Sequence, residues 1–163
     1  MKISNWKRKI YNYLASSIQH LLLTFAKTII MLSLTNFTSF TIRIGEINYG
    51  GHMGNDKTLL LFQDARIRFL EMLGYSEKSL GDNVGIIMTE AHVYYQKEIF
   101  LHDVLLASIE VSEITTASFI LNYKFIREND QKEVINGSTK ILAFDYERGR
   151  VSRLPEEFVN KMK

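Results

Sequence analysis

The sequence predicts an α+β domain, in which one long central helix is wrapped by a five-stranded, mostly antiparallel sheet, preceded by an N-terminal helical extension. Residues 56–73 are rich in helix formers and contain no glycine or proline. Five segments around them have the alternation typical of strands. Residues 1–34 differ from the rest, because they carry a basic cluster and no acid to balance it. We therefore expect an extension over residues 1–34 and one domain, with one hydrophobic core, over residues 35–163.

The extension contains apolar residues at steps of three and four, which place one apolar stripe along a helix: Ile10, Leu14, Ile18, Leu21, Leu22, Phe25 and Ile29. Such a helix could lie on the domain, on a partner or on a membrane surface. We expect no transmembrane span, since the best apolar run, Leu21–Leu34, contains Lys27 and is shorter than the about 20 residues required. No cleavage site of a secretory signal closes the segment. An alternative is an upstream extension, with translation beginning at Met31.

The predicted domain begins with a strand, a turn and the central helix. Phe37–Ile44 alternates apolar and polar residues, as a half-buried strand does. A glycine-rich turn, GEINYGGHMGND, leads into the helix over Asp56–Leu73. Asn55 is the expected N-cap and Gly74 the expected left-handed C-cap. The helix is apolar around most of its circumference, so we expect protein to enclose it.

Four further strands are predicted after the helix, over Val84–Lys97, Val104–Glu113, Ala117–Arg127 and Glu133–Tyr146. Short connections suggest that consecutive strands are antiparallel neighbours. The tail after Pro155 is expected to form a short helix. The sheet has to curl around the helix to cover it, and its edges remain open, so a homodimer is the expected assembly.

Composition excludes several classes of function. The net charge of +2 gives no reason to expect nucleic acid as a partner. The chain has no cysteine, which excludes a cysteine nucleophile and thiolate zinc sites and fits a cytoplasmic protein. His20, His92 and His102 lack the spacing of a metal site. There is no Gly-x-Ser-x-Gly elbow and no phosphate loop. We therefore expect neither a metal nor a separate cofactor.

Three local motifs carry a resemblance to a known family. The run Glu46–Asn55 matches a turn of the form Asp-x-Asp-x-x-Gly-His-x-x-Asn, and Asp64-Ala65-Arg66 matches an acid-Ala-Arg step. The C-terminal motif comprises Gly137 to Phe144, Gly149-Arg150 and Leu154-Pro155. In this order, the segment over residues 35–158 resembles the hotdog-fold acyl-CoA thioesterases, specifically the 4-hydroxybenzoyl-CoA thioesterase-like branch.

The resemblance implies a homodimer or homotetramer that hydrolyses the thioester of an acyl-CoA or an acyl-carrier protein, with CoA present only as part of the substrate. One departure is important, because Asn48 stands where family members often carry the catalytic acid. It favours a rival function, a non-catalytic module of the same fold that binds acyl-CoA or acyl-carrier protein. An acyltransferase or dehydratase relative is a more distant alternative.

The turn offers a way to polarise a thioester carbonyl. The N-terminus of a helix has unpaired N–H groups and a partial positive charge. Gly51 and Gly54 let the backbone approach a ligand closely. We therefore expect Gly51, Gly54 and Asn55 to bind the substrate, with the carbonyl oxygen directed at the N–H groups near Gly54 and Asn55.

Four residues are candidates for the chemistry: Asn48, His52, Asp56 and Asp64. Asp56 is predicted beside the helix N-terminus, where it could activate water or only complement the helix dipole. Asp64 could reach a partner subunit's pocket or only pair with Arg68. His52 could be a base near neutral pH, could orient Asn48 or a water, or could only order the turn. Asn48 is expected to contact substrate or water.

Overall fold

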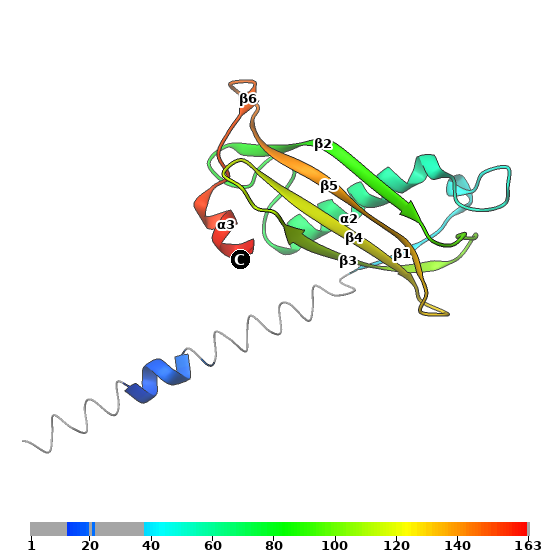
Figure 1. Cartoon of the computed structure of the whole chain (residues 1–163), viewed down its shortest axis with the longest axis horizontal. Coiled ribbons are helices and arrows are strands. Elements are labelled where there is room, and N and C mark those ends of the chain that lie inside the picture. Colours follow the sequence, from blue (N-terminus) through cyan, green and yellow to red (C-terminus); the bar gives the residue numbers. More distant parts are fainter. Residues whose placement is uncertain (1–12, 20, 22–37, 163) are drawn as a thin grey trace, which may run out of the picture. The chain divides into compact units, whose positions relative to one another are not determined.

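The computed structural model describes residues 13–19, 21 and 38–162 (Figure 1). The chain divides into two units, Met1–Thr35 and Asn36–Lys163. In the first, residues 13–19 and 21 are helical and exposed. The predictions for Leu21–Leu34 and for a start at Met31 fall almost entirely outside the described residues. Within the described ranges, no helix is long and apolar enough to cross a membrane.

The second unit contains one antiparallel sheet and the helix α2, which lies along it (Figure 1). The strands are β1 (Thr38–Thr41), β2 (Val84–Tyr95), β3 (Val104–Ser112), β4 (Ser118–Arg127), β5 (Glu133–Asp145) and β6 (Arg150–Val151). The first five lie inside the predicted segments, which confirms the alternation as a strand signal. The tail forms α3 (Glu156–Met162), as predicted.

The strand order is β1-β3-β4-β5-β2, with β6 paired to β5. The expectation that consecutive strands pair holds for β3, β4 and β5 and is wrong for β2, which pairs with β5 instead of β3. The reason is that α2 connects β1 to β2 over one face of the sheet. These two strands therefore form opposite edges, and β3 returns to pair with β1.

The central helix begins with a 3-10 turn, η2 (Asn55–Lys57), and continues as α2 (Thr58–Met72). Gly54 occupies the N-cap position of this turn, so the expectation of Asn55 as N-cap is wrong by one residue. Asp56 lies in the first turn, as predicted. Gly74 has a φ of +82°, which confirms the left-handed cap.

The core lies between α2 and the sheet. The ring of Phe62 stacks on Tyr123, with centroids 4.3 Å apart, and lies parallel to Phe125. Gly137 of β5 leaves room for this ring, since a Cβ there would lie 2.9 Å from it. Further buried residues of the helix are Ala65, Phe69 and Leu70. The sheet thus fixes the helix through its aromatic face.

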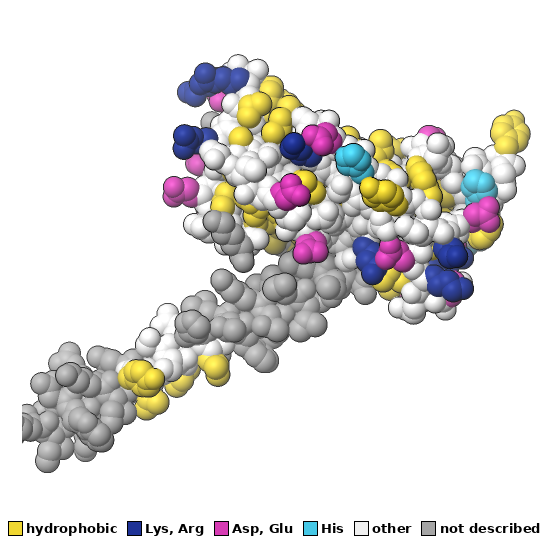
Figure 2. Space-filling view, viewed as in Figure 1, with side chains coloured by type: hydrophobic (Ala, Val, Ile, Leu, Met, Phe, Trp, Pro, Cys, Tyr) yellow, Lys and Arg dark blue, Asp and Glu magenta, His cyan; other side chains and the backbone are white. Residues whose placement is uncertain are grey.

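The opposite face of the helix is not enclosed in this protomer, which corrects part of the prediction. Leu59 and Leu60 are 44% and 59% exposed. Figure 2 shows apolar side chains among charged ones on one face of the molecule. Exposed apolar side chains also occur on β2, where they include Met88, Tyr94 and Tyr95. The sheet of one chain is wide enough to cover only one side of its helix.

Candidate functional site at the N-terminus of the central helix

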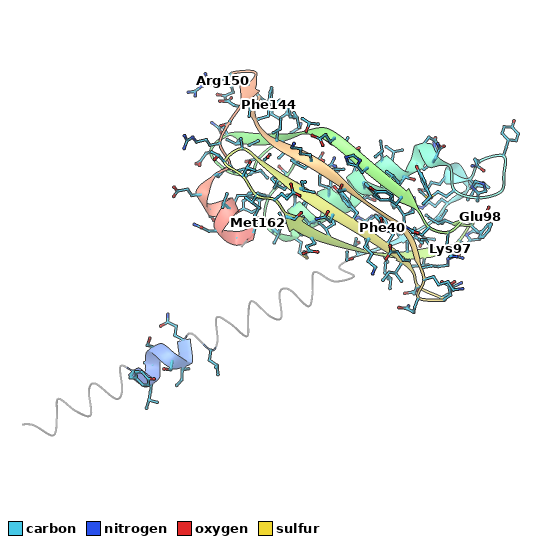
Figure 3. All side chains as sticks on the ribbon, in the orientation of Figure 1. Phe40, Lys97, Glu98, Phe144, Arg150 and Met162 are labelled. Atoms are coloured by element: carbon cyan, nitrogen blue, oxygen red, sulfur yellow. The ribbon has the colours of Figure 1, made fainter. Side chains whose placement is uncertain are left out.

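A cavity of about 390 Å³ lies where the glycine-rich turn meets the first turn of the helix. The turn and the helix form two walls of this cavity, and the connection between β2 and β3 forms the third wall. The lining residues are Asn48, His52, Met53, Asn55, Thr58, Tyr95, Gln96, Lys97, Glu98, Ile99 and Ile135. Figure 3 shows Lys97 and Glu98 at this end of the sheet, whereas Arg150 and Met162 lie at the opposite end.

Asn48 organises the glycine-rich turn. Its N–H donates to the carbonyl of His52 at 2.9 Å, and its own carbonyl accepts the N–H of Gly51 at 3.0 Å. Its side-chain Oδ1 accepts the N–H of Gly50 at 2.8 Å. This last bond orients the amide, so that Nδ2 faces the ring of His52. Gly51 has a φ of +78°, which explains the glycine at the tip of the turn.

The contacts of His52 favour one tautomer of its ring. Nδ1 lies 3.2 Å from the carbonyl of Met53 and 3.4 Å from Nδ2 of Asn48. The first contact requires a proton on Nδ1, the second a lone pair. The shorter contact favours the Nδ1–H tautomer, which leaves the lone pair on Nε2. The Nε2 atom lies close over Gly50, where a Cβ would approach it to 2.8 Å.

The two expected carbonyl-binding amides differ in their partners. Gly54 donates its N–H to the carbonyl of Glu46 at 2.8 Å, which ties the turn together and occupies this donor. Among the described residues, no hydrogen bond engages the N–H of Asn55. Asn55 also lines the cavity, whereas Gly51 and Gly54 do not. Of these two amides, that of Asn55 is free among the described residues, at the end of the helix.

Both aspartates predicted for the chemistry lie outside the lining of this cavity. Asp56 is exposed and pairs with Lys57 at 2.9 Å; the hydrogen bond from Lys57 holds the pKa of the Asp56 carboxyl below its usual value. Asp64 forms two hydrogen bonds to Arg68, of 2.9 and 3.0 Å. Arg68 also lies over the ring of Phe40. This pair lines a separate groove along α2 and β1.

Thr58 and Glu98 are among the lining residues that the sequence analysis did not predict. Thr58 is 1% exposed, and its Oγ1 is buried without a hydrogen bond to any described residue. A polar residue on the buried side of an apolar helix is the signal that would have found it. Glu98, whose carboxylate comes from the β2–β3 connection, had no such signal.

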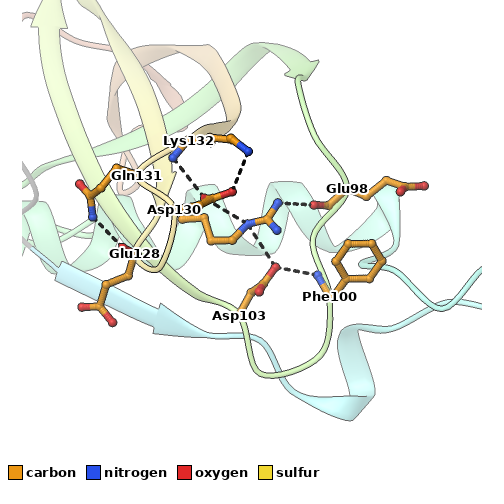
Figure 4. Close-up of polar contacts among 8 residues, drawn as sticks. Glu98, Phe100, Asp103, Glu128, Asp130, Gln131 and Lys132 are labelled. Atoms are coloured by element: carbon orange, nitrogen blue, oxygen red, sulfur yellow. Dashed lines mark hydrogen bonds and ion pairs between the residues drawn. The ribbon is translucent and has the colours of Figure 1, made fainter.

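The β2–β3 connection is held by Arg127 of β4 (Figure 4). Its Nη2 donates to the carbonyl of Glu98 at 2.6 Å, and its Nε lies 3.5 Å from Oδ2 of Asp103. The same oxygen of Asp103 accepts the N–H of Phe100 at 2.9 Å. Arg127 is mostly buried, so this clamp is shielded from water and fixes one wall of the cavity.

Comparisons with known proteins agree with this architecture. The model of the thioesterase-like superfamily matches residues 42–162. No curated protein matches the chain significantly. A gentisyl-coenzyme A thioesterase is 18% identical with a TM-score of 0.68, and the match covers 77% of this chain and 98% of that one. A 1,4-dihydroxy-2-naphthoyl-CoA thioesterase from Synechocystis is 13% identical, with a TM-score of 0.68 and coverages of 77% and 93%.

A third similar structure is a Staphylococcus aureus protein solved in complex with CoA. It is 17% identical with a TM-score of 0.67, and the match covers 77% of this chain and 79% of that one. At these identities the likeness concerns the fold, which confirms the predicted hotdog architecture.

Proposed function

This chain belongs to the thioesterase-like superfamily, and we propose on this premise that it hydrolyses a CoA thioester to a free acid and CoA. The observation that carries the proposal is the free N–H of Asn55, a residue that lines, together with His52, the cavity at the N-terminus of the central helix. A helix N-terminus attracts the negative charge that develops on a thioester oxygen during attack.

The carbonyl oxygen of the substrate accepts the N–H of Asn55 in this proposal. The oxygen becomes an oxyanion when water adds to the carbonyl carbon, and one fixed donor at such a position typically lowers the barrier by about 3 kcal/mol. The bond from Gly54 to Glu46 supports the role of Asn55 indirectly, because it holds the preceding residue rigid.

His52 is the base that we propose. Nε2 takes a proton from water, the water oxygen attacks the carbonyl carbon, the C–S bond breaks, and the departing thiolate takes up a proton. The contact of Nδ1 with the carbonyl of Met53 supports this, because it keeps the lone pair on Nε2. Asn48 orients the turn and contacts the imidazole without being a base itself.

A carboxylate base is the alternative, as the resemblance suggested. Among the described residues that line the cavity, Glu98 is the one with a carboxylate. Asp56 stays a candidate only if it turns away from Lys57, and Asp64 only if a second subunit brings its helix to the cavity. Four variants separate these options: His52→Gln, Glu98→Gln, Asp56→Asn and Asp64→Asn. None of the new side chains can act as a base. The base is therefore the residue whose replacement removes most of kcat.

The cavity wall and the similar structures support a proposal for the substrate class. Met53, Ile99 and Ile135 give the wall an apolar part, and Lys97 adds a cation that suits a phosphate of CoA. Two similar structures are named as thioesterases of aromatic acyl-CoAs. We therefore propose an aromatic acyl-CoA as the substrate to test first.

A homodimer or homotetramer remains the proposed assembly. In the described part of the chain, β2 pairs only with β5, so its other edge is open. The helix α2 also exposes Leu59 and Leu60. A second copy that covers the exposed face of the helix would bury this apolar surface. Light scattering on the eluting protein measures the mass, and a monomer at micromolar concentration would contradict this part of the proposal.

The activity test is release of free CoA from benzoyl-CoA, acetyl-CoA and palmitoyl-CoA, followed with a thiol-reactive dye. We expect saturable release, lost in the His52→Gln variant and retained in Glu71→Gln, a surface change on the same helix. The rival function, binding without turnover, is favoured by Asn48 in place of an acid. Saturable binding of benzoyl-CoA with no release above buffer would establish the rival and refute hydrolysis.

A further inference from the structure

Thr58, the first residue of α2, contains a buried polar atom that no described residue satisfies. The residue is 1% exposed, and its Oγ1 has no hydrogen-bond partner. Leaving a buried hydroxyl unpaired is unfavourable, so native structures rarely do it without a ligand or a functional reason. The same residue lines the cavity at the N-terminus of the helix.

The hydroxyl of Thr58 does not use the usual partners of a helical threonine, which are the carbonyls three and four residues earlier. The carbonyl of Gly54 accepts the N–H of Lys57 at 3.0 Å. The carbonyl of Asn55 accepts the N–H of Thr58 itself and the hydroxyl of Tyr95, the latter at 3.4 Å. Because the hydroxyl of Thr58 bonds neither carbonyl, it is an unused donor at the end of the helix that borders the cavity.

The position of Thr58 on the helix brings its hydroxyl to the same side as the free amide. Asn55 and Thr58 are three residues apart, which is close to one turn, and helical side chains lean toward the N-terminus. Both residues line the cavity. A single small acceptor at the end of the helix can thus meet a backbone donor from Asn55 and a side-chain donor from Thr58.

We propose that the hydroxyl of Thr58 is a second donor to the thioester oxygen, so that the oxyanion is held by two groups, the Asn55 N–H and the Thr58 O–H. This rests on the proposed function and adds a catalytic residue to it. Thr58 donates a hydrogen bond and keeps its proton, and no bond to the substrate forms at its oxygen. Water remains the nucleophile.

Two substitutions test the proposal on the full chain. Thr58→Val keeps the shape and removes the hydroxyl; Thr58→Ser keeps the hydroxyl. With benzoyl-CoA we expect Thr58→Val to lower kcat about 100-fold, the typical loss for one oxyanion donor, and Thr58→Ser to stay within about fivefold of the wild type. Because the hydroxyl has no partner among the described residues, the melting temperature of Thr58→Val should equal or exceed that of the wild type.

Each other outcome overturns the inference. If Thr58→Val hydrolyses benzoyl-CoA at the wild-type rate, Thr58 has no catalytic role and the proposed function stands. If its melting temperature falls, the hydroxyl has a protein partner and is structural.

If the wild type hydrolyses no thioester, the proposed function fails, and Thr58 is then tested by binding of phenacyl-CoA, whose ketone replaces the thioester carbonyl. We expect Thr58→Val to raise the Kd about tenfold, the loss typical of a hydrogen bond to a buried acceptor. An unchanged Kd, or no binding by the wild type, would refute the role of the hydroxyl.

Discussion

The helix α2 buries two polar residues, and their surroundings differ. Arg66, in its second half, is 7% exposed and donates from Nε to Glu77 at 2.7 Å. Thr58, at its start, is 1% exposed and has no partner among the described residues. A buried group with a partner anchors the fold, whereas a buried group without one, beside a cavity, is where a ligand is expected.

The C-terminal end of α2, near Arg66, is covered by several further contacts. Lys161 of α3 donates from Nζ to the carbonyl of Leu73 at 2.6 Å, which caps the C-terminus of the helix. Below the helix, the hydroxyl of Tyr123 bonds Oγ1 of Thr139 at 2.9 Å. Burial raises the pKa of Tyr123, so this hydroxyl stays neutral. The end near Thr58 lacks such a cover and borders the cavity.

The largest expected effect is on stability at the closed end. Replacing Arg66 by Met leaves Glu77 without its partner, and breaking this partly buried pair should lower the free energy of unfolding by about 3 kcal/mol, the low end of the range for buried pairs. Urea unfolding measures it. Arg68→Met removes an exposed pair with Asp64 and should cost less than about 1 kcal/mol. Equal losses in the two variants would show that the pair of Arg66 with Glu77 does not anchor this end of the helix as proposed.

The next effect is on catalysis at the open end. A Cβ at Gly50 would lie 2.8 Å from Nε2 of His52. Because a side chain can shift, Gly50→Ala should fold normally, but it should displace the proposed base and lower kcat about 100-fold. Gly45→Ala is the matched control, since nothing lies within 4 Å of a Cβ there. An unchanged rate in Gly50→Ala would remove His52 as the base.

A smaller effect is expected at the wall of the cavity. Arg127→Met frees the carbonyl of Glu98 and the carboxylate of Asp103, so that the β2–β3 connection loses its clamp. We expect KM for benzoyl-CoA to rise about tenfold with kcat less affected, because the wall positions the substrate without contacting the reacting atoms. Steady-state kinetics test this, and a loss confined to kcat would contradict it.

The smallest effect concerns Asp56. Its pKa is lowered chiefly by Lys57, so Lys57→Met should raise that pKa toward the ordinary value. Because the pKa of Asp56 is lower in the folded than in the unfolded protein, its ionised carboxylate stabilises the fold at a pH above the unfolded pKa. This stabilisation is lost as the pH falls through the folded pKa. Asp56 is therefore ionised near neutral pH in both proteins, and the pH–rate profile above roughly pH 5 should not move. An acid limb that shifts with the NMR titration of Asp56 would make Asp56 the base after all.

The sequence predicted more of the fold than of the site. Alternation placed β1 to β5, because period two is a local signal, and it missed the two-residue strand β6, which makes the sheet six-stranded. It could not place β2 beside β5, since that pairing depends on the helix that connects β1 to β2. In the site, Asn48, His52 and Asn55 line one cavity, as residues of one short turn can. The unpaired hydroxyl of Thr58 depends on tertiary packing at the start of the helix, where Tyr95 reaches the carbonyl of Asn55 from a strand 40 residues later.

The central claim is that the N–H of Asn55 binds the thioester oxygen, and the most direct test is its amide NMR signal during titration with phenacyl-CoA. We predict a saturable downfield shift of the Asn55 proton, while the amide of Gly54, already bonded to Glu46, stays in place. Saturable shifts elsewhere with the Asn55 signal unmoved would contradict the account.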